Sequence, residues 1–221
     1  MSIEKLVEPI NKVMDFITDI VKPPIKEITE ILTDKVKYWR FQNQIEILEK
    51  AQQYIKNKGY KPEQIPVKTL VPLLEGASLE EDESMQDKWA ALLANAANPD
   101  NIFSSHIIFV ELLKQLSPHE CAILDLMVNG SFLTSSAHLP YFNRNDIIRH
   151  LEIKYKNGDI LMENLLRLNL VNTAEVELLS NNVGDEEDES EELQLKIDKN
   201  KIKLTTLGVE LVRICSIVSQ K

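Results

Sequence analysis

The sequence predicts a mainly α-helical protein, in which an N-terminal and central helical region is followed by a C-terminal α+β module. Up to about residue 127, apolar side chains recur at the three- and four-residue spacing of amphipathic helices. The chain has only six glycines, and these fit turns and helix ends. Strand-like alternation of apolar and polar residues occurs only after residue 170. These observations divide the chain into the expected regions 1–57, 58–128 and 129–221.

The composition is that of a soluble globular protein. The chain has 221 residues, of which 43% are hydrophobic and 27% charged. We expect a cytoplasmic protein, because the sequence lacks an apolar run of transmembrane length and a signal-peptide core at its start. Cys121 and Cys215 each lie among apolar helix-type residues, which predicts buried thiols.

The net charge of −10 is unevenly spread along the chain. Residues 1–57 balance nine acids with nine bases, whereas residues 119–221 carry seventeen acids and eleven bases. Seven of these acids lie in the run at 185–192, within an expected solvated loop at 180–192. An acidic chain repels nucleic acid, so a nucleic-acid partner is not expected without a local basic patch.

The N-terminal region predicts two amphipathic helices, at 3–21 and 24–57, separated by a break at the two prolines of 22–24. The second could reach about 50 Å at 1.5 Å per residue. One small core does not cover an apolar stripe of that length, so we expect a homo-oligomer or a protein partner. The stripe includes Ile28, Ile31, Leu32, Val36 and Trp39.

The central region predicts a short helix at 66–75, ended by Gly76, and then a helix that opens with a cluster of carboxylates. Ser78 and Glu81 have the spacing of a capping box, in which each side chain bonds to the other's backbone amide. Acidic side chains also suit the positive end of a helix dipole. The stripe that follows contains Trp89, which predicts a core anchor. The carboxylates are therefore interpreted as a helix start and not as a metal or acid–base site.

A further helix is expected at 104–116. After it, Ser117, Pro118 and Glu120 form a second capping box, with proline at the first helical position, and predict a helix to Met127. Residues 128–145 are expected to form a long polar loop that could contain a short strand.

The C-terminal region predicts a winged-helix-like module. Its expected parts are a helix at 146–155, a turn at 156–159, a helix at 160–168, a strand near 170–179, a hairpin at 193–205 and a closing helix at 206–219. The presumed recognition helix would show Asp159, Glu163 and Arg167 on its outer face, which is a poor set for reading DNA bases. Lys199 and Lys201 belong to a local basic cluster in the hairpin, and we expect this module to bind protein.

The central sequence resembles the Abi-alpha (abortive infection alpha) family of bacterial proteins. The resemblance rests on three stretches, at 35–59, 65–99 and 109–127, of which the second, beginning "IPVKTLVPLLEGASLEEDESMQDKW", is the most specific. It covers roughly residues 20–130. It implies a link to phage defence by abortive infection, and it supplies no catalytic residues. The motif positions have a structural character: Pro72, Leu74, Glu75, Ser78, Trp89 and Leu93.

The usual signatures of catalysis are absent from the sequence. There is no phosphate-binding glycine loop, no His-Glu-x-x-His and no Cys-x-x-Cys. Arg144 and His150 are one residue too far apart for the Arg-x₄-His spacing of some phage-defence ribonucleases. We therefore expect no catalytic residue, no metal, no cofactor and no enzymatic activity.

Three functional hypotheses remain. The favoured one is a non-enzymatic interaction protein of phage defence that senses a phage product or holds a protein partner. The second is a DNA-binding regulator that uses the winged helix. The third is a membrane-acting effector, suggested by Trp39 and Arg40 beside further basic residues, but the balanced charge of residues 1–57 argues against attraction to anionic lipid.

Overall fold

The protein is described from a computed structural model, which covers residues 38–100, 106–132, 140–173, 177–179, 194–196 and 200–216. The chain forms two compact units. Unit 1 comprises Met1–Pro118 and Leu211–Lys221, and unit 2 comprises His119–Glu210. The prediction of a mainly α-helical chain with a C-terminal α+β module is confirmed.

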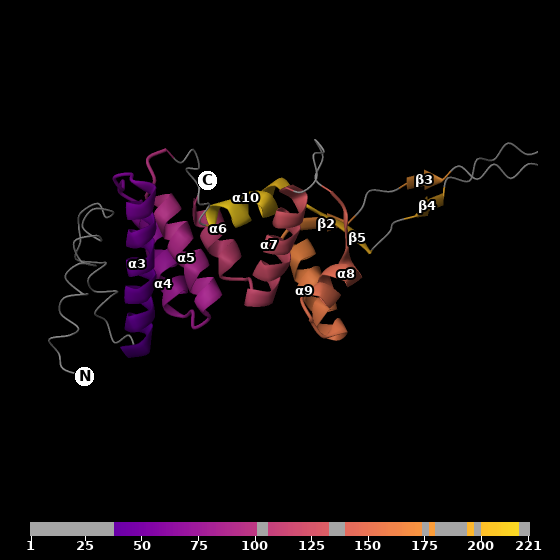
Figure 1. Cartoon of the computed structure of the whole chain (residues 1–221), viewed down its shortest axis with the longest axis horizontal. Coiled ribbons are helices and arrows are strands. Elements are labelled where there is room, and N and C mark those ends of the chain that lie inside the picture. Colours follow the sequence, from indigo (N-terminus) through magenta and orange to yellow (C-terminus); the bar gives the residue numbers. More distant parts are fainter. Residues whose placement is uncertain are drawn as a thin grey trace, which may run out of the picture. The chain divides into compact units, whose positions relative to one another are not determined.

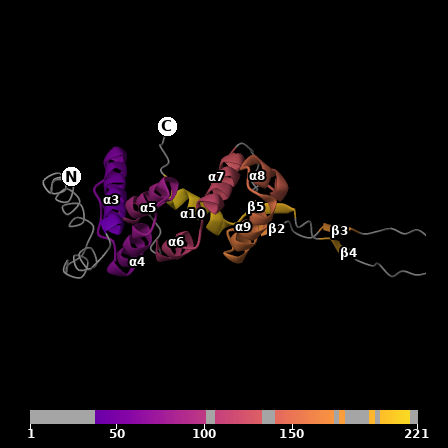
Figure 2. The same cartoon turned by 90° about the horizontal axis from the view of Figure 1, so that it is seen from below.

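Unit 1 is a helical bundle in which α3 lies along α4 and α5, as both views show (Figures 1 and 2). One face of α3 is buried in this bundle and carries Ile47, Leu48, Ala51 and Ile55. The described part of the predicted long helix therefore folds onto its own chain. Residues 24–37, which hold most of the apolar stripe expected to mediate self-association, lie outside the described residues. The helices of the unit are α3 (Tyr38–Lys58), α4 (Val67–Ser78), α5 (Glu83–Ala96) and α6 (His106–Leu113).

Polar contacts tie α3 and the loop after it to α5. Lys50 forms an ion pair of 2.9 Å with Asp87, which also accepts a hydrogen bond of 3.4 Å from the Tyr54 hydroxyl. The Tyr60 hydroxyl donates to the carbonyl oxygen of Ala94 at 2.6 Å, and burial raises the pKa of Tyr60 to about 12. These contacts fix the register of α3 on α5, and α5 carries the floor of the site described below.

The described part of unit 2 combines α7, α8, α9 and the start of α10 with a small antiparallel sheet of order β1-β5-β2. In this sheet Phe142 pairs with Ile202, and Val171 pairs with Leu204. Strands β3 and β4 form a separate antiparallel pair, and the acidic run at 185–192 falls between them in the sequence. The elements are α7 (Pro118–Phe132), β1 (Phe142–Asn143), α8 (Arg144–His150), α9 (Tyr155–Arg167), β2 (Val171–Thr173), β3 (Glu177–Leu179), β4 (Gln194–Lys196), β5 (Lys201–Leu204) and the start of α10 (Thr206–Ile214).

Some expected boundaries in this unit are wrong. The turn expected at 156–159 belongs to α9, because Gly158 is a site of close helix contact: a Cβ there would lie 2.6 Å from Cδ1 of Ile148 on α8. The strand expected near 170–179 is described as two, β2 and β3. The loop expected at 128–145 begins with the end of α7, and β1 is a short strand of the kind expected within it. The interpretation of the module as a winged helix rests on its element order, which has one helix before β1 and two between β1 and β2.

The two units differ from the three regions expected from the sequence. No division falls near residue 57, because α3 packs on α4 and α5. The second division lies at 118/119 and not at 128/129, and the end of the chain from Leu211 belongs to unit 1. Within that unit the Asn95 side chain donates a hydrogen bond of 2.7 Å to the carbonyl oxygen of Ile214. The acidic loop at 180–192 lies outside the described residues.

Candidate functional site

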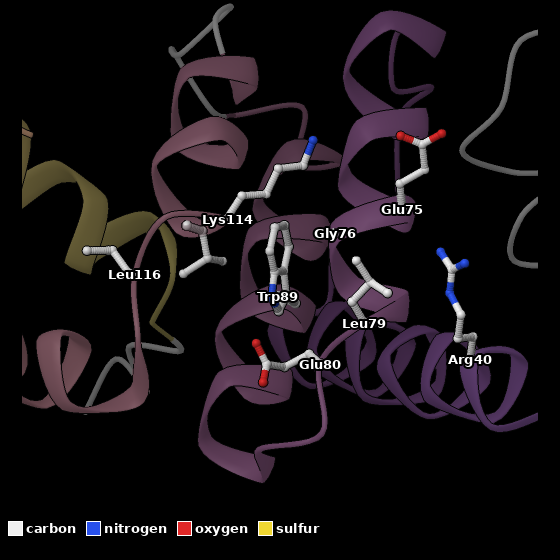
Figure 3. Close-up of a pocket in the computed structure, with 9 residues that line it drawn as sticks. Arg40, Glu75, Gly76, Leu79, Glu80, Trp89, Lys114 and Leu116 are labelled. Carbon is white, nitrogen blue, oxygen red and sulfur yellow. The ribbon is translucent and has the colours of Figure 1, made fainter.

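A hollow of about 480 Å³ opens on unit 1 among α3, α4, α5 and the segment that follows α6. Figure 3 shows the indole of Trp89 at its centre, with charged side chains around it. We call it the Trp89 hollow. Its lining is Arg40, Glu75, Gly76, Leu79, Glu80, Trp89, Leu113, Lys114 and Leu116. Much of this lining comes from the carboxylate-rich stretch that the sequence singled out.

The floor of the hollow is Trp89, which is 2% exposed. Gly76 on α4 lies against its ring, and a Cβ there would lie 2.6 Å from Cη2 of the indole. Gly76 therefore does not end the helix, as the sequence suggested, but lies inside α4 where that helix packs against the indole of Trp89 on α5. The indole Nε1 is buried and finds no hydrogen-bond partner among the described residues.

One wall of the hollow is held by a chain of hydrogen bonds. The Arg40 guanidinium donates to the Ser78 hydroxyl from Nη2 at 2.9 Å and from Nε at 3.3 Å. The Ser78 hydroxyl in turn donates to the carbonyl oxygen of Glu75 at 2.7 Å. The positive charge of Arg40 thus lies at the C-terminal end of α4, where the helix dipole favours a cation.

Two further side chains of α3 cap the same helix end. Gln44 donates to the carbonyl oxygen of Leu74 at 3.3 Å, and Asn43 donates to that of Ser78 at 3.4 Å. The carbonyl groups of the last four helical residues, here including Ser78, have no i+4 partner within the helix and need one elsewhere. Arg40, Asn43 and Gln44 are three or four residues apart and therefore lie on one face of α3. This face donates hydrogen bonds to the end of α4 and holds the wall of the hollow in place.

The rim of the hollow combines balanced charge with an exposed apolar residue. Arg40 and Lys114 bring positive charge, and Glu75 and Glu80 bring negative charge. Lys114 forms an ion pair of 3.0 Å with Glu111. Leu79 lies between Arg40 and Trp89 in Figure 3 and is 59% exposed.

The capping box expected at Ser78 and Glu81 is wrong. Ser78 is the last residue of α4, and α5 begins only at Glu83. The N-cap of α5 is Asp82, whose carboxylate accepts from the Met85 amide at 3.1 Å. The cap falls four residues later because the Ser78 hydroxyl is already engaged by Arg40 and Glu75. The interpretation of the acids as a helix start holds for Asp82 and Glu83.

The other expected motif positions lie in the helices as follows. Pro72 is inside α4, Leu74 and Leu93 are buried in the core of unit 1, and Glu75 lines the hollow. In unit 2, α7 begins at Pro118 as predicted, after Ser117. Glu120 is 3% exposed and accepts a hydrogen bond of 2.5 Å from Asn164 on α9.

The residues expected to mediate interactions are only partly described. Arg40 lines the hollow, and Lys201 is exposed in β5, where the neighbouring Lys203 lies over the ring of Tyr141 at 5.3 Å. The side chain of Trp39 and the whole of Lys199 lie outside the described residues.

The outer face of α9 is the surface that would read DNA in a winged helix. Tyr155 and Ile160 on this helix are 62% and 67% exposed. The sequence places Asp159 on this outer face. In the structure its carboxylate is paired with Arg144, and the ion pair has a length of 2.5 Å. Arg167 donates to Asn164 at 2.7 Å. Arg144, the first residue of α8, thus binds to α9, whereas His150 at the other end of α8 is exposed.

No group of three or more His, Cys, Asp or Glu side chains in the described ranges is placed to hold a metal ion. Every helix in those ranges is too short or too polar to cross a membrane.

The comparison with known families matches the abortive infection alpha family model over residues 40–215, which is most of the chain and includes every residue of the hollow. The chain belongs to the abortive infection alpha family. No curated protein matches the chain, and no solved structure does. The family ties this protein to abortive infection, the bacterial defence in which phage infection is aborted.

Sequence reasoning named Arg40, Glu75, Ser78 and Trp89 but did not bring them together. It missed Leu79 and Lys114 as parts of one site. Leu79 lies inside the capping box expected at residues 78–81, and that interpretation hid its place on the rim. An exposed leucine between two helices was the only local signal for it. Lys114 carried none, since it reaches the hollow only through the packing of α4 and α6.

Proposed function

We propose that this member of the abortive infection alpha family is a non-enzymatic interaction protein of the bacterial cytoplasm, which acts in phage defence through protein–protein contacts and self-association. The observation that carries the proposal is the Trp89 hollow with exposed Leu79 on its rim. A recess with an aromatic floor beside an exposed large apolar side chain is typical of the anchor points of protein interfaces. The wall of the hollow is preorganised by α3, so a partner would meet a rigid surface.

The self-association part of the proposal rests on the sequence before α3. The buried face of α3 is occupied by α4 and α5 and offers nothing to a second copy. Within the stripe of the predicted long helix, we assign self-association to the residues before residue 38, such as Ile28, Ile31 and Val36. Dimers or larger species are expected at micromolar concentration, and a clean monomer in analytical sedimentation would remove this part.

The test of the contact function compares two exposed apolar residues of unit 1. Leu79→Arg places a charge on the rim of the hollow, whereas Ile108→Arg places one on α6 at a residue that is 50% exposed and does not line the hollow. Both variants should keep the fold, because both side chains are exposed. We expect Leu79→Arg to lose protection in a phage plaque assay at equal protein level and Ile108→Arg to retain it. Equal protection by both variants would contradict the proposal.

DNA binding is the second candidate function. The helix–strand–helix–helix–strand order of unit 2 and the exposed Lys201 favour it. The outer face of α9 weakens it, because exposed Tyr155 and Ile160 and the carboxylate of Asp159 lie beside its exposed bases, Lys156 and Arg167. Base readers present arginine, lysine, asparagine or glutamine across this face.

A further inference from the structure

We propose that the segment directly before α3, residues 32–37, docks in cis on Leu79 and the acidic residues that follow it. We call this surface, residues 79–83, the Leu79 turn. The inference rests on the proposed function, because Leu79 is the exposed contact that we assign to a partner. It adds a regulation of that contact, since the docked segment covers Leu79 until a partner displaces it.

The first argument is the register of α3 on α4. The Gln44 side chain donates to the carbonyl oxygen of Leu74. Four residues earlier on α3, Arg40 donates to the hydroxyl of Ser78, which lies four residues later on α4. The two helices therefore run antiparallel, and one further helical turn before Arg40 advances by about 6 Å. This turn reaches residues 36 and 37, level with the chain that follows Ser78, which is the Leu79 turn.

The second argument is the helix face that meets this turn. The sequence predicts that the helix containing α3 begins before residue 38, near residue 24. In such a helix Val36, Arg40 and Asn43 share one face, because they are spaced i, i+4 and i+7. Arg40 and Asn43 both donate hydrogen bonds to Ser78, and Leu79 is the next residue. Val36 would therefore meet Leu79, which is 59% exposed and lies beside Arg40 in Figure 3.

The third argument is charge complementarity. The Leu79 turn contains four consecutive acids, and neither Glu80 nor Glu81 forms an ion pair with a described residue. Val36 lies between two bases, Lys35 and Lys37. Contact of Val36 with the turn brings both lysines to the acids. Exposed ion pairs add little stability each, so the apolar contact holds the segment and the charges fix its position.

The fourth argument is the covalent connection between the segment and α3. The segment ends at Lys37, three residues before Arg40, so it is held at the edge of the turn. A short connection gives an effective concentration in the millimolar range, which favours docking within one copy over docking between copies. Val36 also belongs to the stripe that we assign to self-association. Docking and self-association therefore exclude each other, and release of the segment frees both Leu79 and the stripe.

Cysteine cross-linking of the full chain tests the docking. The native thiols, Cys121 and Cys215, are both buried. The Val36→Cys, Leu79→Cys variant should form an intrachain disulfide under mild oxidation of the dilute protein, because a disulfide requires Cα atoms within about 7 Å. Intrachain and interchain products are separated on a non-reducing gel.

Two matched pairs serve as controls for the cross-link. The Asp34→Cys, Leu79→Cys pair moves one thiol to the opposite face of the predicted helix. The Val36→Cys, Ile108→Cys pair moves the other thiol to an exposed residue of α6 that does not line the hollow. Both pairs should form the intrachain disulfide at least about tenfold more slowly, which is expected where the Cα atoms lie beyond bridging distance. Each variant is first checked for an unchanged melting temperature under reducing conditions.

Charge reversal tests the role of the acids. Glu80→Lys with Glu81→Lys should slow the cross-link several-fold, and adding Lys35→Glu with Lys37→Glu should restore it. The difference should shrink in about 1 M salt, where the screening length is about 3 Å. Without introduced cysteines, the Glu80→Lys, Glu81→Lys variant should form dimers at a lower protein concentration than the wild type, because the stripe is released.

Several results would overturn the inference. They are equal rates for the test pair and either control pair, a cross-link that charge reversal leaves unchanged, and a mainly interchain disulfide whose yield rises with protein concentration. The last result, or dimers weakened by the reversal of Glu80 and Glu81, would mean that a second copy occupies the turn. If Leu79→Arg abolishes phage protection and no intrachain disulfide forms, the proposed function stands and the docking falls. A specific intrachain disulfide with full protection by Leu79→Arg would uphold the docking and remove the proposed function.

Discussion

Gly76 on α4 and Trp89 on α5 lie against each other: a methyl group on Gly76 would lie 2.6 Å from Cη2 and 3.0 Å from Cζ2 of the indole. The helix tolerates a glycine in its interior at a cost of about 0.5–1 kcal/mol relative to alanine. The absence of a side chain at residue 76 is therefore what leaves room for the indole of Trp89 against α4.

Gly76→Ala is expected to destabilise the protein despite the better helix propensity of alanine. Overpacking a core typically costs about 1–3 kcal/mol, which exceeds the propensity gain. Urea unfolding should show a net loss of about 1–2 kcal/mol. The control is the same substitution in a Trp89→Phe background, where the smaller ring removes the clash and the loss should shrink. An equal loss in both backgrounds would mean that the clash is not with the indole.

Trp89→Ala should cost about 3–5 kcal/mol, because it removes a large buried side chain and leaves a cavity. Trp89→Phe should cost clearly less, since Nε1 has no hydrogen bond within the described structure that the substitution could break. Denaturant unfolding of the two variants measures the difference. A Trp89→Phe loss as large as that of alanine would show that the indole nitrogen has a stabilising partner after all.

Asp82, and not Ser78, is expected to act as the helix cap of α5. Asp82→Ala should cost about 0.5–2 kcal/mol, whereas Asp82→Asn should retain most of the stability, because asparagine caps equally well. Glu81→Ala should change stability by less than about 0.5 kcal/mol, as for an ordinary surface residue. Thermal melts of the three variants decide between the two caps. A large effect of Glu81→Ala would restore the capping box that the sequence suggested.

The periodicity of apolar residues was sufficient to predict the helices, but not their ends. Stripes such as the one containing Met85 and Trp89 identify a buried face, and the burial of both residues agrees. Helix ends depend on which polar side chain is free to cap, and that is decided by tertiary contacts. Ser78 had the right sequence context for a cap, yet Arg40, 38 residues earlier, engages its hydroxyl. Gly76 and Gly158 were interpreted as breaks because close packing between helices leaves no signal in the local sequence.

The Trp89 hollow could not be predicted from the sequence for a related reason. Its residues come from α3, α4, α5 and the end of α6, so the site exists only after the four segments have packed. The apolar stripe predicts that Trp89 is a core residue, and the burial of its side chain agrees. The sequence does not predict that its indole N–H has no hydrogen-bond partner among the described residues.

The stability of the protein should depend on His106 at mildly acidic pH. Burial lowers the pKa of His106 from its ordinary value of 6.5. Below pH 6.5 the unfolded chain takes up a proton that the folded chain resists, so the stabilising contribution is complete above that pH and is lost as the pH falls through the folded pKa. Urea midpoints measured between pH 7 and 5 should fall more steeply for the wild type than for His106→Gln. Parallel profiles would show that other groups cause the slope.

The final prediction concerns DNA, because the element order of unit 2 invites that function. We expect no submicromolar, salt-sensitive binding of duplex DNA in a gel shift at low salt. The outer face of α9 presents Tyr155 and Ile160, and Asp159 is neutralised by Arg144. Its exposed bases are Lys156 and Arg167, and Arg167 is held by Asn164, so this face offers few free donors to base edges. Wing lysines alone would give weak binding that is insensitive to sequence and falls steeply with salt. The decisive comparison pairs wild type with a Lys199→Glu, Lys201→Glu double variant. Tight binding by the wild type that the double variant loses would establish the regulator hypothesis in place of the interaction protein.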